Sequence, residues 1–224
     1  MKNATVIMLV VGLAMAAPAF ADFSGSKTVL SGETWDEDGD IAKNGNTDIT
    51  INVGGTMTGG EFMAADEWGY TFDMNIYGTA NIEQFKIYGD GACTVVVGNG
   101  TDAAALNVDE GFLGKAGDST ITINSGSSMT VDASANAWAG EFEIRTDFTS
   151  SINLVGTGTL RLINDGTYAA DLWNANLVIG NGGANPVTSA QVGDYVVYST
   201  TPEPATMSLL ALGGLAMLRR RRNR

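Results

Sequence analysis

The chain has 224 residues, a net charge of −13 and no histidine, and its single cysteine is Cys93. The absence of histidine excludes Ser-His-Asp and Cys-His catalytic pairs and most zinc sites, and one cysteine cannot form an internal disulfide. Residues 22–200 carry 24 acidic and six basic residues, a net charge of −18, which argues against binding to nucleic acid or to anionic lipid surfaces.

The N-terminus has the pattern of a secretory signal peptide. A positive head precedes an apolar run from Ala4 to Ala17, and Ala19 and Ala21 form a small-x-small cleavage site. We therefore predict a signal helix over 1–21 that signal peptidase removes before Asp22. The alternative is an uncleaved anchor, but the apolar run is shorter than the roughly 20 residues of a membrane span.

The segment WDEDGD holds the densest acidic cluster of the chain. Asp36, Asp38 and Asp40 alternate, so on a strand their carboxylates lie on one face and repel one another unless a cation or water screens them. The segment departs from an EF-hand loop, because Ile41 stands at the required glycine position. We predict a candidate Ca²⁺ site at these three aspartates and no other cofactor; the alternative is a solvated turn.

The body repeats a unit made of an alternating strand, a glycine and a second alternating strand. The clearest copies begin at Ile49, Phe72, Ile121 and Ser151. The glycine recurs at intervals of 22 to 30 residues, at Gly32, Gly54, Gly78, Gly100, Gly126, Gly156 and Gly180. A second mark, a phenylalanine shortly after an acidic residue, recurs at Phe62, Phe85, Phe112 and Phe142.

Such a unit cannot bury its own apolar face, but stacked units bury it against one another. Alternation places Ile49, Ile51 and Val53 on one predicted face, and glycines predict the corners. We therefore predict an all-β, single-domain parallel β-solenoid of about seven coils over 22–200. A last strand or cap is expected over 191–199. The alternative is an antiparallel β-sandwich, whose strands recur as often.

Other residues of the body are candidates for lesser roles. Cys93 starts an apolar strand and is predicted in the core, with a reactive thiol as the alternative. Irregularly spaced Thr-x-Thr pairs leave ice binding as a remote alternative. Four tryptophans are candidates for stacking on sugar rings, but their spacing does not follow the coil period, so we expect each to pack a loop against the solenoid: Trp35, Trp68, Trp138 and Trp173.

The C-terminal segment 201–224 has three parts. Pro202, Glu203 and Pro204 come first, and the two prolines hold the chain extended. Residues 205–218 form an apolar run that is marginal for a bilayer core of about 30 Å. An arginine cluster follows, which the positive-inside rule places on the cytoplasmic side: Arg219, Arg220, Arg221, Arg222 and Arg224. We predict a transmembrane-like helix over 205–218 and transient anchoring in the inner membrane.

This three-part tail closely resembles the PEP-CTERM sorting signal of exosortase substrates. The resemblance covers the last 24 residues or so and does not determine the fold of the body. It implies an exported protein whose tail an exosortase-type membrane protease processes near Pro202, Glu203 and Pro204. Proteins with such tails are typically surface or extracellular-matrix proteins of bacteria that make exopolysaccharide, so exopolysaccharide is a candidate partner.

We therefore expect a non-enzymatic cell-surface or extracellular-matrix protein with a structural or adhesive role, which is tethered and then processed at its tail. Its final location would be the cell surface or the medium. The alternative is a carbohydrate-active module on the same scaffold, which binds or cleaves polysaccharide. None of the six basic residues of the body sits in an acidic motif, so the pattern of a polysaccharide lyase is missing.

Overall fold

The computed structural model describes residues 23–37, 45–64, 70–87, 91–113, 118–132, 141–144, 150–164, 171–173 and 178–201. These ranges are all β apart from one short 3₁₀ turn, η3 (Asn181–Gly183). The predicted signal helix over 1–21 and the predicted apolar helix over 205–218 lie outside the described residues.

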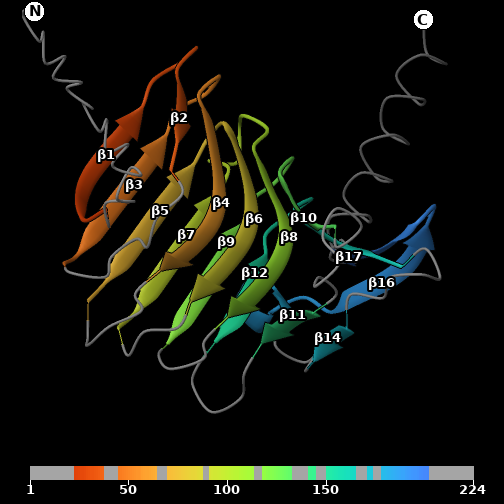
Figure 1. Cartoon of the computed structure of the whole chain (residues 1–224). Helices are drawn as coiled ribbons and strands as arrows, with labels where there is room; N and C mark the ends of the chain where they lie inside the picture. Colours follow the sequence, from red (N-terminus) through yellow and green to blue (C-terminus); the bar gives the residue numbers. More distant parts are fainter. Residues whose placement is uncertain are drawn as a thin grey trace, which may run out of the picture.

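Two sheets form the walls of the molecule, and the chain passes from one to the other in each turn (Figure 1). The first sheet contains, in spatial order, β1 (Gly25–Val29), β3 (Thr47–Ile51), β5 (Phe72–Ile76), β7 (Cys93–Val97), β9 (Ser119–Ile123), β12 (Ser151–Leu154) and β15 (Val178–Gly180). The second contains β2 (Thr34–Asp36), β4 (Thr56–Ala64), β6 (Thr79–Ile87), β8 (Ala105–Leu113), β10 (Ser128–Val131), β13 (Thr159–Ile163), β17 (Tyr195–Thr200) and β16 (Val187–Val192). Two short strands, β11 (Glu141–Ile144) and β14 (Asp171–Trp173), continue the second sheet beside the end of β8.

The strands of the first sheet pair in parallel and without slippage from one turn to the next. Their last residues stand in one column: Val29, Ile51, Ile76, Val97, Ile123, Leu154 and Gly180. A slip of one residue would turn every buried side chain of a strand toward solvent, so the alternating pattern specifies this register. The predicted parallel β-solenoid is confirmed, and the alternative of an antiparallel β-sandwich is wrong.

The number of coils is lower than the predicted seven. About four turns, β3–β4, β5–β6, β7–β8 and β9–β10, have parallel neighbours on both sides in both sheets. The turn β1–β2 stands at one end, β13 is covered by an antiparallel strand, and β15 belongs to the first sheet alone. The glycine count therefore overestimated the number of coils, because its first member, Gly32, and its last two, Gly156 and Gly180, lie in these end structures.

A hairpin closes the C-terminal end, where the sequence predicted a last strand or cap over 191–199. β17 runs antiparallel to both β13 and β16, so the series of parallel strands in the second sheet ends at β13. In the first sheet, the chain folds back beyond β15 and forms an antiparallel bridge between Gly180 and Asn185. The Asn185 N–H donates a hydrogen bond of 3.0 Å to the Gly180 carbonyl.

The space between the sheets is filled by one apolar core. Phe72, Met74 and Ile49 are fully buried there, because alternate residues of each strand point inward. Cys93 is 2% exposed among them, as predicted, and burial raises the pKa of its thiol. The alternation predicted that Val53 shares the buried face of Ile49, and this is wrong. β3 ends two residues before Val53, whose side chain is 49% exposed.

The corner glycines serve two different purposes. Gly54 and Gly126 both have a φ of 78°, a left-handed conformation that glycine adopts without strain. Gly78 lies one register position later, level with Gly55, because Thr56 and Thr79 are paired. A Cβ atom on Gly78 would lie 2.3 Å from the carbonyl oxygen of Gly55. Gly54 and Gly78 therefore occupy different corner positions, although the repeat makes them look equivalent.

The recurring phenylalanines are aligned in register in only part of the stack. Phe62 pairs with Phe85, but Phe85 pairs with Gly111, which in turn pairs with Phe142. Phe112 is therefore offset by one residue from the column that the other three define. The spacing in the sequence does not reveal this offset, because the turns between strands differ in length.

Candidate functional site

The predicted sorting tail follows directly on the folded body. Thr201 comes one residue after β17, and its N–H and its hydroxyl donate to the Pro186 carbonyl over 3.1 and 3.0 Å. The residues predicted for sorting and for signal cleavage lie outside the described residues: Pro202, Glu203, Pro204, Arg219, Arg220, Arg221, Arg222, Ala19 and Ala21. The contact of Thr201 with Pro186 thus holds the chain one position before Pro202.

Across the ranges given above, the structure contains no helix with the length and apolar character needed to cross a membrane. The predicted anchor over 205–218 falls outside those ranges, so membrane anchoring by this segment stays a prediction.

One of the three aspartates of the predicted Ca²⁺ site is described. Asp36 is exposed on β2, and its Oδ1 accepts a hydrogen bond of 2.7 Å from the Thr58 hydroxyl on β4. Asp38 and Asp40 lie outside the described residues. In the part of the chain that the structure covers, no group of three or more acidic or cysteine side chains is arranged to hold a metal ion. The calcium site therefore stays a prediction.

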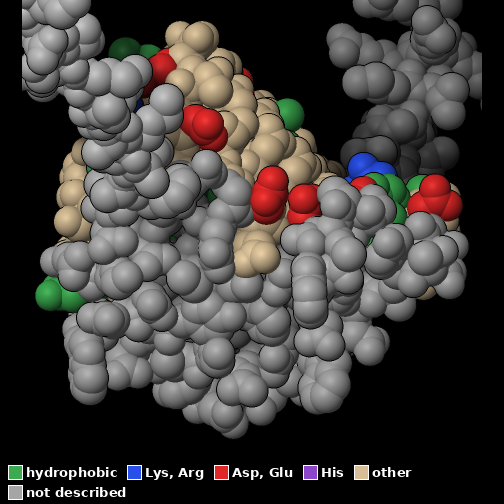
Figure 2. Space-filling view, viewed as in Figure 1, with side chains coloured by type: hydrophobic (Ala, Val, Ile, Leu, Met, Phe, Trp, Pro, Cys, Tyr) green, Lys and Arg blue, Asp and Glu red, His purple; other side chains and the backbone are tan. Residues whose placement is uncertain are grey.

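A row of carboxylates that the sequence did not predict lies on the outer face of the second sheet. One register column of the second sheet contains the buried residues Ile82, Val108 and Val131. An acidic residue follows each of them: Glu83 on β6, Asp109 on β8 and Asp132 directly after β10. Figure 2 shows acidic side chains gathered on this side of the molecule. The signal that could have found the row is an acidic residue after an aliphatic one in three successive turns.

The middle carboxylate of this row has a shifted pKa. Partial burial raises the pKa of Asp109, and the negative charges of Asp132 and Glu83 raise it further. Parallel strands lie about 4.8 Å apart, so carboxylates on three neighbouring strands repel one another. Asp109 thus stands between two like charges.

The C-terminal hairpin meets one end of the row. The Tyr195 hydroxyl donates a hydrogen bond to Oδ2 of Asp132, and the Arg161 guanidinium lies 4.6 Å from the centre of the Tyr195 ring. The hydrogen bond to Asp132 is the largest cause of a raised pKa at Tyr195, and the charge of Arg161 opposes it. The hairpin therefore brings a hydrogen-bond donor, Tyr195, to the acidic row, and β13 supplies the cation that lies over its ring.

Outward polar side chains of the second sheet form columns across the turns. One register position carries hydroxyl side chains on every strand from β2 to β13 except β8, which has Ala105 there: Thr34, Thr56, Thr79, Ser128 and Thr159. In the adjacent outward column, the Asn107 side-chain amide donates to Oδ1 of Asn81 over 2.8 Å. The Thr-x-Thr pairs at 56–58 and 157–159 thus share one column through Thr56 and Thr159 alone, and the pair at 120–122 lies on the first sheet.

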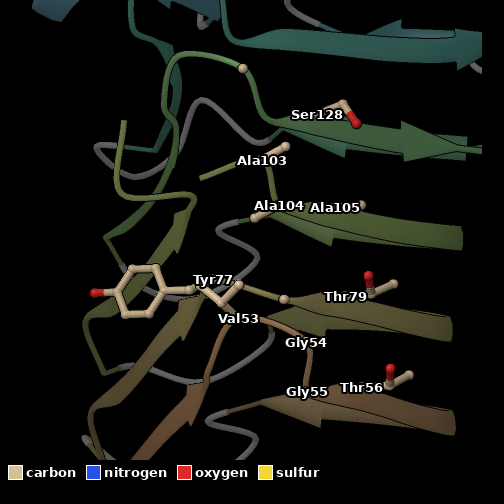
Figure 3. A pocket seen from close by; sticks show the side chains of 12 residues that line it. Val53, Gly54, Gly55, Thr56, Tyr77, Thr79, Ala103, Ala104, Ala105 and Ser128 are labelled. Carbon is tan, nitrogen blue, oxygen red and sulfur yellow. The ribbon is translucent and has the colours of Figure 1, made fainter. Parts of the chain in front are cut away.

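An open groove of about 340 Å³ follows the corner between the two sheets, and residues of four successive turns line it (Figure 3). Thr56, Thr79 and Ser128 stand along its border with the second sheet. Tyr77 lies on the other side, and its ring extends away from these hydroxyls. This groove is not apparent from the sequence, because its residues are separated by whole turns.

Trp35 packs at the N-terminal end of the solenoid. Its ring meets the ring of Phe23 edge-on with 5.2 Å between the centroids, and Lys27 Nζ lies 5.5 Å from its centroid. The side chains of Trp68, Trp138 and Trp173 lie outside the described set. Trp35 therefore packs against the end of the stack, and sugar stacking stays a prediction for all four tryptophans.

Comparison with known proteins bears on the C-terminus of the chain. No curated protein and no solved structure matches the chain significantly. The family model of the PEP-CTERM protein-sorting motif matches residues 200–222, which include the Pro-Glu-Pro segment and the arginines from Arg219 to Arg222. This match confirms the resemblance noted in the sequence. The chain therefore carries a PEP-CTERM protein-sorting motif at its C-terminus, which indicates an exported protein sorted through this segment.

Proposed function

We propose that this protein is a non-enzymatic cell-surface or extracellular-matrix protein with a structural or adhesive role, processed at its C-terminal motif by an exosortase-type protease. The observation that carries the proposal is the sorting motif at 200–222, which starts at the last residue of β17. In this proposal signal peptidase removes residues 1–21. The segment 205–218 then tethers the body to the inner membrane until the protease releases it to the surface or the medium.

The body supports a structural role through the way its polar groups are used. On the outer face of the second sheet, Thr58 bonds to Asp36 and Asn107 bonds to Asn81, each across neighbouring turns. Side chains that pair along the stack stabilise it and are less available to a substrate. The net charge of −18 on residues 22–200 favours solubility outside the cell.

The experiment that tests the sorting proposal is mass spectrometry of the protein from its native cell. We expect a C-terminus near Pro202 and the loss of the arginine cluster. The variant Glu203→Ala should retain the tail, whereas Asp194→Ala, which removes an exposed carboxylate from the hairpin turn at the opposite end of β17, should be processed normally. An external protein that still carries Arg219–Arg222 would contradict the proposal.

A second candidate function, binding of polysaccharide, is favoured by the corner groove. The groove crosses four turns, so an extended glycan could contact all of them at once. The Tyr77 ring on one side of the groove offers an aromatic face, and Thr56 and Thr79 on the other side offer hydroxyls, so a glycan that contacts both has to span the groove. The acidic body favours neutral over acidic glycans, because like charges repel.

Binding can be measured by pull-down of the full chain on neutral and acidic polysaccharides. If the groove binds, Tyr77→Ala and Thr79→Val should reduce retention on the neutral glycan. Thr122→Val changes an outward threonine of the first sheet, away from the groove, and should leave retention unchanged. Equal retention of all variants would exclude the groove, and release of unsaturated sugar ends would contradict the non-enzymatic assignment.

A further inference from the structure

The two ends of the solenoid are protected in different ways. At the C-terminal end, the antiparallel hairpin covers β13 and leaves β16 as the outermost strand, and the bridge from Gly180 to Asn185 folds over β15. At the N-terminal end, β1 and β2 each have a neighbour on one side, within the residues that the structure describes. An edge strand offers unpaired N–H and C=O groups to any second chain, so this end needs another form of protection.

Lys27 stands at an inward-facing position of the edge strand β1. The residues in register with it on the following strands are aliphatic or methionine and are buried: Ile49, Met74, Val95, Ile121, Ile152 and Val178. The one charge in this column therefore lies where a further stacked coil would bury the side chain. A burial of this kind is costly for an ammonium group unless it is paired.

Three side chains hold Lys27 in place at this end. Its Nζ donates to Oε1 of Glu33 over 3.2 Å and lies 5.5 Å from the centroid of Trp35. Oε2 of the same carboxylate accepts a hydrogen bond of 2.9 Å from the Leu30 N–H, which orients it. Phe23 supports the Trp35 ring edge-on. The side chains of Lys27 and Glu33 are 30% and 37% exposed, so water still solvates the pair.

We propose that Phe23, Lys27, Glu33 and Trp35, the N-terminal lock, prevent the free edge of the solenoid from pairing with a second copy of this chain. A second copy placed on β1 would remove the ion pair from water or separate its partners, and both changes are unfavourable. An inward-pointing lysine on an edge strand is one of the devices that keep sheets from joining edge to edge. The lock thereby keeps the body monomeric at its N-terminal end.

The test variant is Lys27→Ile, which places at the edge the residue type that Ile49 supplies one turn later. The full chain in mild detergent is studied by sedimentation over a range of concentrations. Wild type should stay monomeric through this edge, and Lys27→Ile should associate with a constant at least about tenfold higher. Hydrogen exchange should show new protection of the β1 amides in the associated form.

Two controls separate the lock from a general effect of hydrophobicity. Lys27→Arg keeps a cation beside Glu33 and Trp35, and it should remain monomeric. Thr28→Val adds an apolar group to the exposed outer position next along β1, and it should remain monomeric too.

The proposal is overturned if folded Lys27→Ile sediments like wild type, or if Thr28→Val associates as strongly. Protection that appears on β16 instead of β1 would overturn it as well. If Lys27→Ile does not fold, Lys27→Met takes its place with the same outcomes, because its unbranched side chain resembles lysine in shape.

Discussion

Tyr195 and Asp132 are 63 residues apart in sequence, and the Tyr195 hydroxyl donates a hydrogen bond of 2.5 Å to Oδ2 of Asp132. This bond links the antiparallel hairpin to the end of β10, one strand beyond its direct neighbour β13. It therefore attaches the C-terminal closure to the interior turns by a contact that is independent of the β13–β17 ladder.

We expect Tyr195→Phe to lower the free energy of unfolding by about 1 kcal/mol, because a partly exposed hydrogen bond to a carboxylate is lost. Thermal melting near neutral pH measures the change, and Tyr77→Phe, on the corner groove, should change it by less than about 0.5 kcal/mol. The bond raises the pKa of Tyr195 above its ordinary value of 10.0. Its contribution is therefore complete below pH 10 and lost as the pH rises through the raised pKa. An equal difference between wild type and variant at all pH values would contradict this assignment.

Two neighbouring residues of β9 test the orientation of the strands. Ile121 is fully buried and Thr120 points outward, because consecutive side chains of a strand face opposite ways. Ile121→Ala should lower the free energy of unfolding by about 2–5 kcal/mol, and Thr120→Ala by less than about 1 kcal/mol. Chemical denaturation measures both. Similar costs for the two variants would mean that the register is shifted by one residue.

Gly78 and Gly100 test two different reasons for a glycine at a corner, which are close approach of the backbone and a left-handed conformation. A Cβ atom on Gly78 would lie 2.3 Å from the Gly55 carbonyl oxygen, whereas Gly100 has a φ of 85° and open space around it. We expect Gly78→Ala to cost about 3 kcal/mol, because backbone must move, and Gly100→Ala to cost about 1 kcal/mol of backbone strain. A larger loss of melting stability in Gly100→Ala would show that the corner geometry is different.

The acidic row predicts a stability that falls as the pH rises. Asp109 has a pKa raised above its ordinary value of 3.8, by partial burial first and then by Asp132 and Glu83. The folded chain thus holds this proton more tightly than the unfolded chain, so the contribution of Asp109 to stability declines from pH 3.8 upward through its raised pKa and is constant above it. Asp109→Asn should be more stable than wild type at pH 7, with the advantage vanishing below that interval. Melting curves across this range provide the measurement, and an advantage that persists at low pH would contradict the prediction.

The sequence predicted the features that depend on local chemistry. Alternation placed Ile49, Ile121 and Cys93 inside, and the left-handed glycines such as Gly54 marked real corners. The Pro-Glu-Pro segment with its arginines was recognisable because its three parts are contiguous. Each of these signals lies within a window of a few residues, where strand period and turn chemistry decide the outcome.

Other features depend on how turns of unequal length align, and these could not be predicted. Gly111 stands in the column of Phe85, and Gly78 lies level with Gly55, because insertions between strands shift the spacing by one residue. The row of Glu83, Asp109 and Asp132 appears only once the register of β6, β8 and β10 is known. The last strand or cap over 191–199 was predicted, but its antiparallel hairpin form was not, since an alternating strand pattern does not tell which direction the strand runs.

The antiparallel direction of β17 limits how a body of this kind can change in length. A parallel coil added after the hairpin would find no parallel partner, since β16 is the outermost strand there and the chain leaves from β17. Duplication of an interior turn, such as β5–β6, would instead present matching parallel neighbours above and below. Longer forms of this body should therefore arise by duplication of interior turns, while the β1–β2 turn and the C-terminal hairpin stay unchanged.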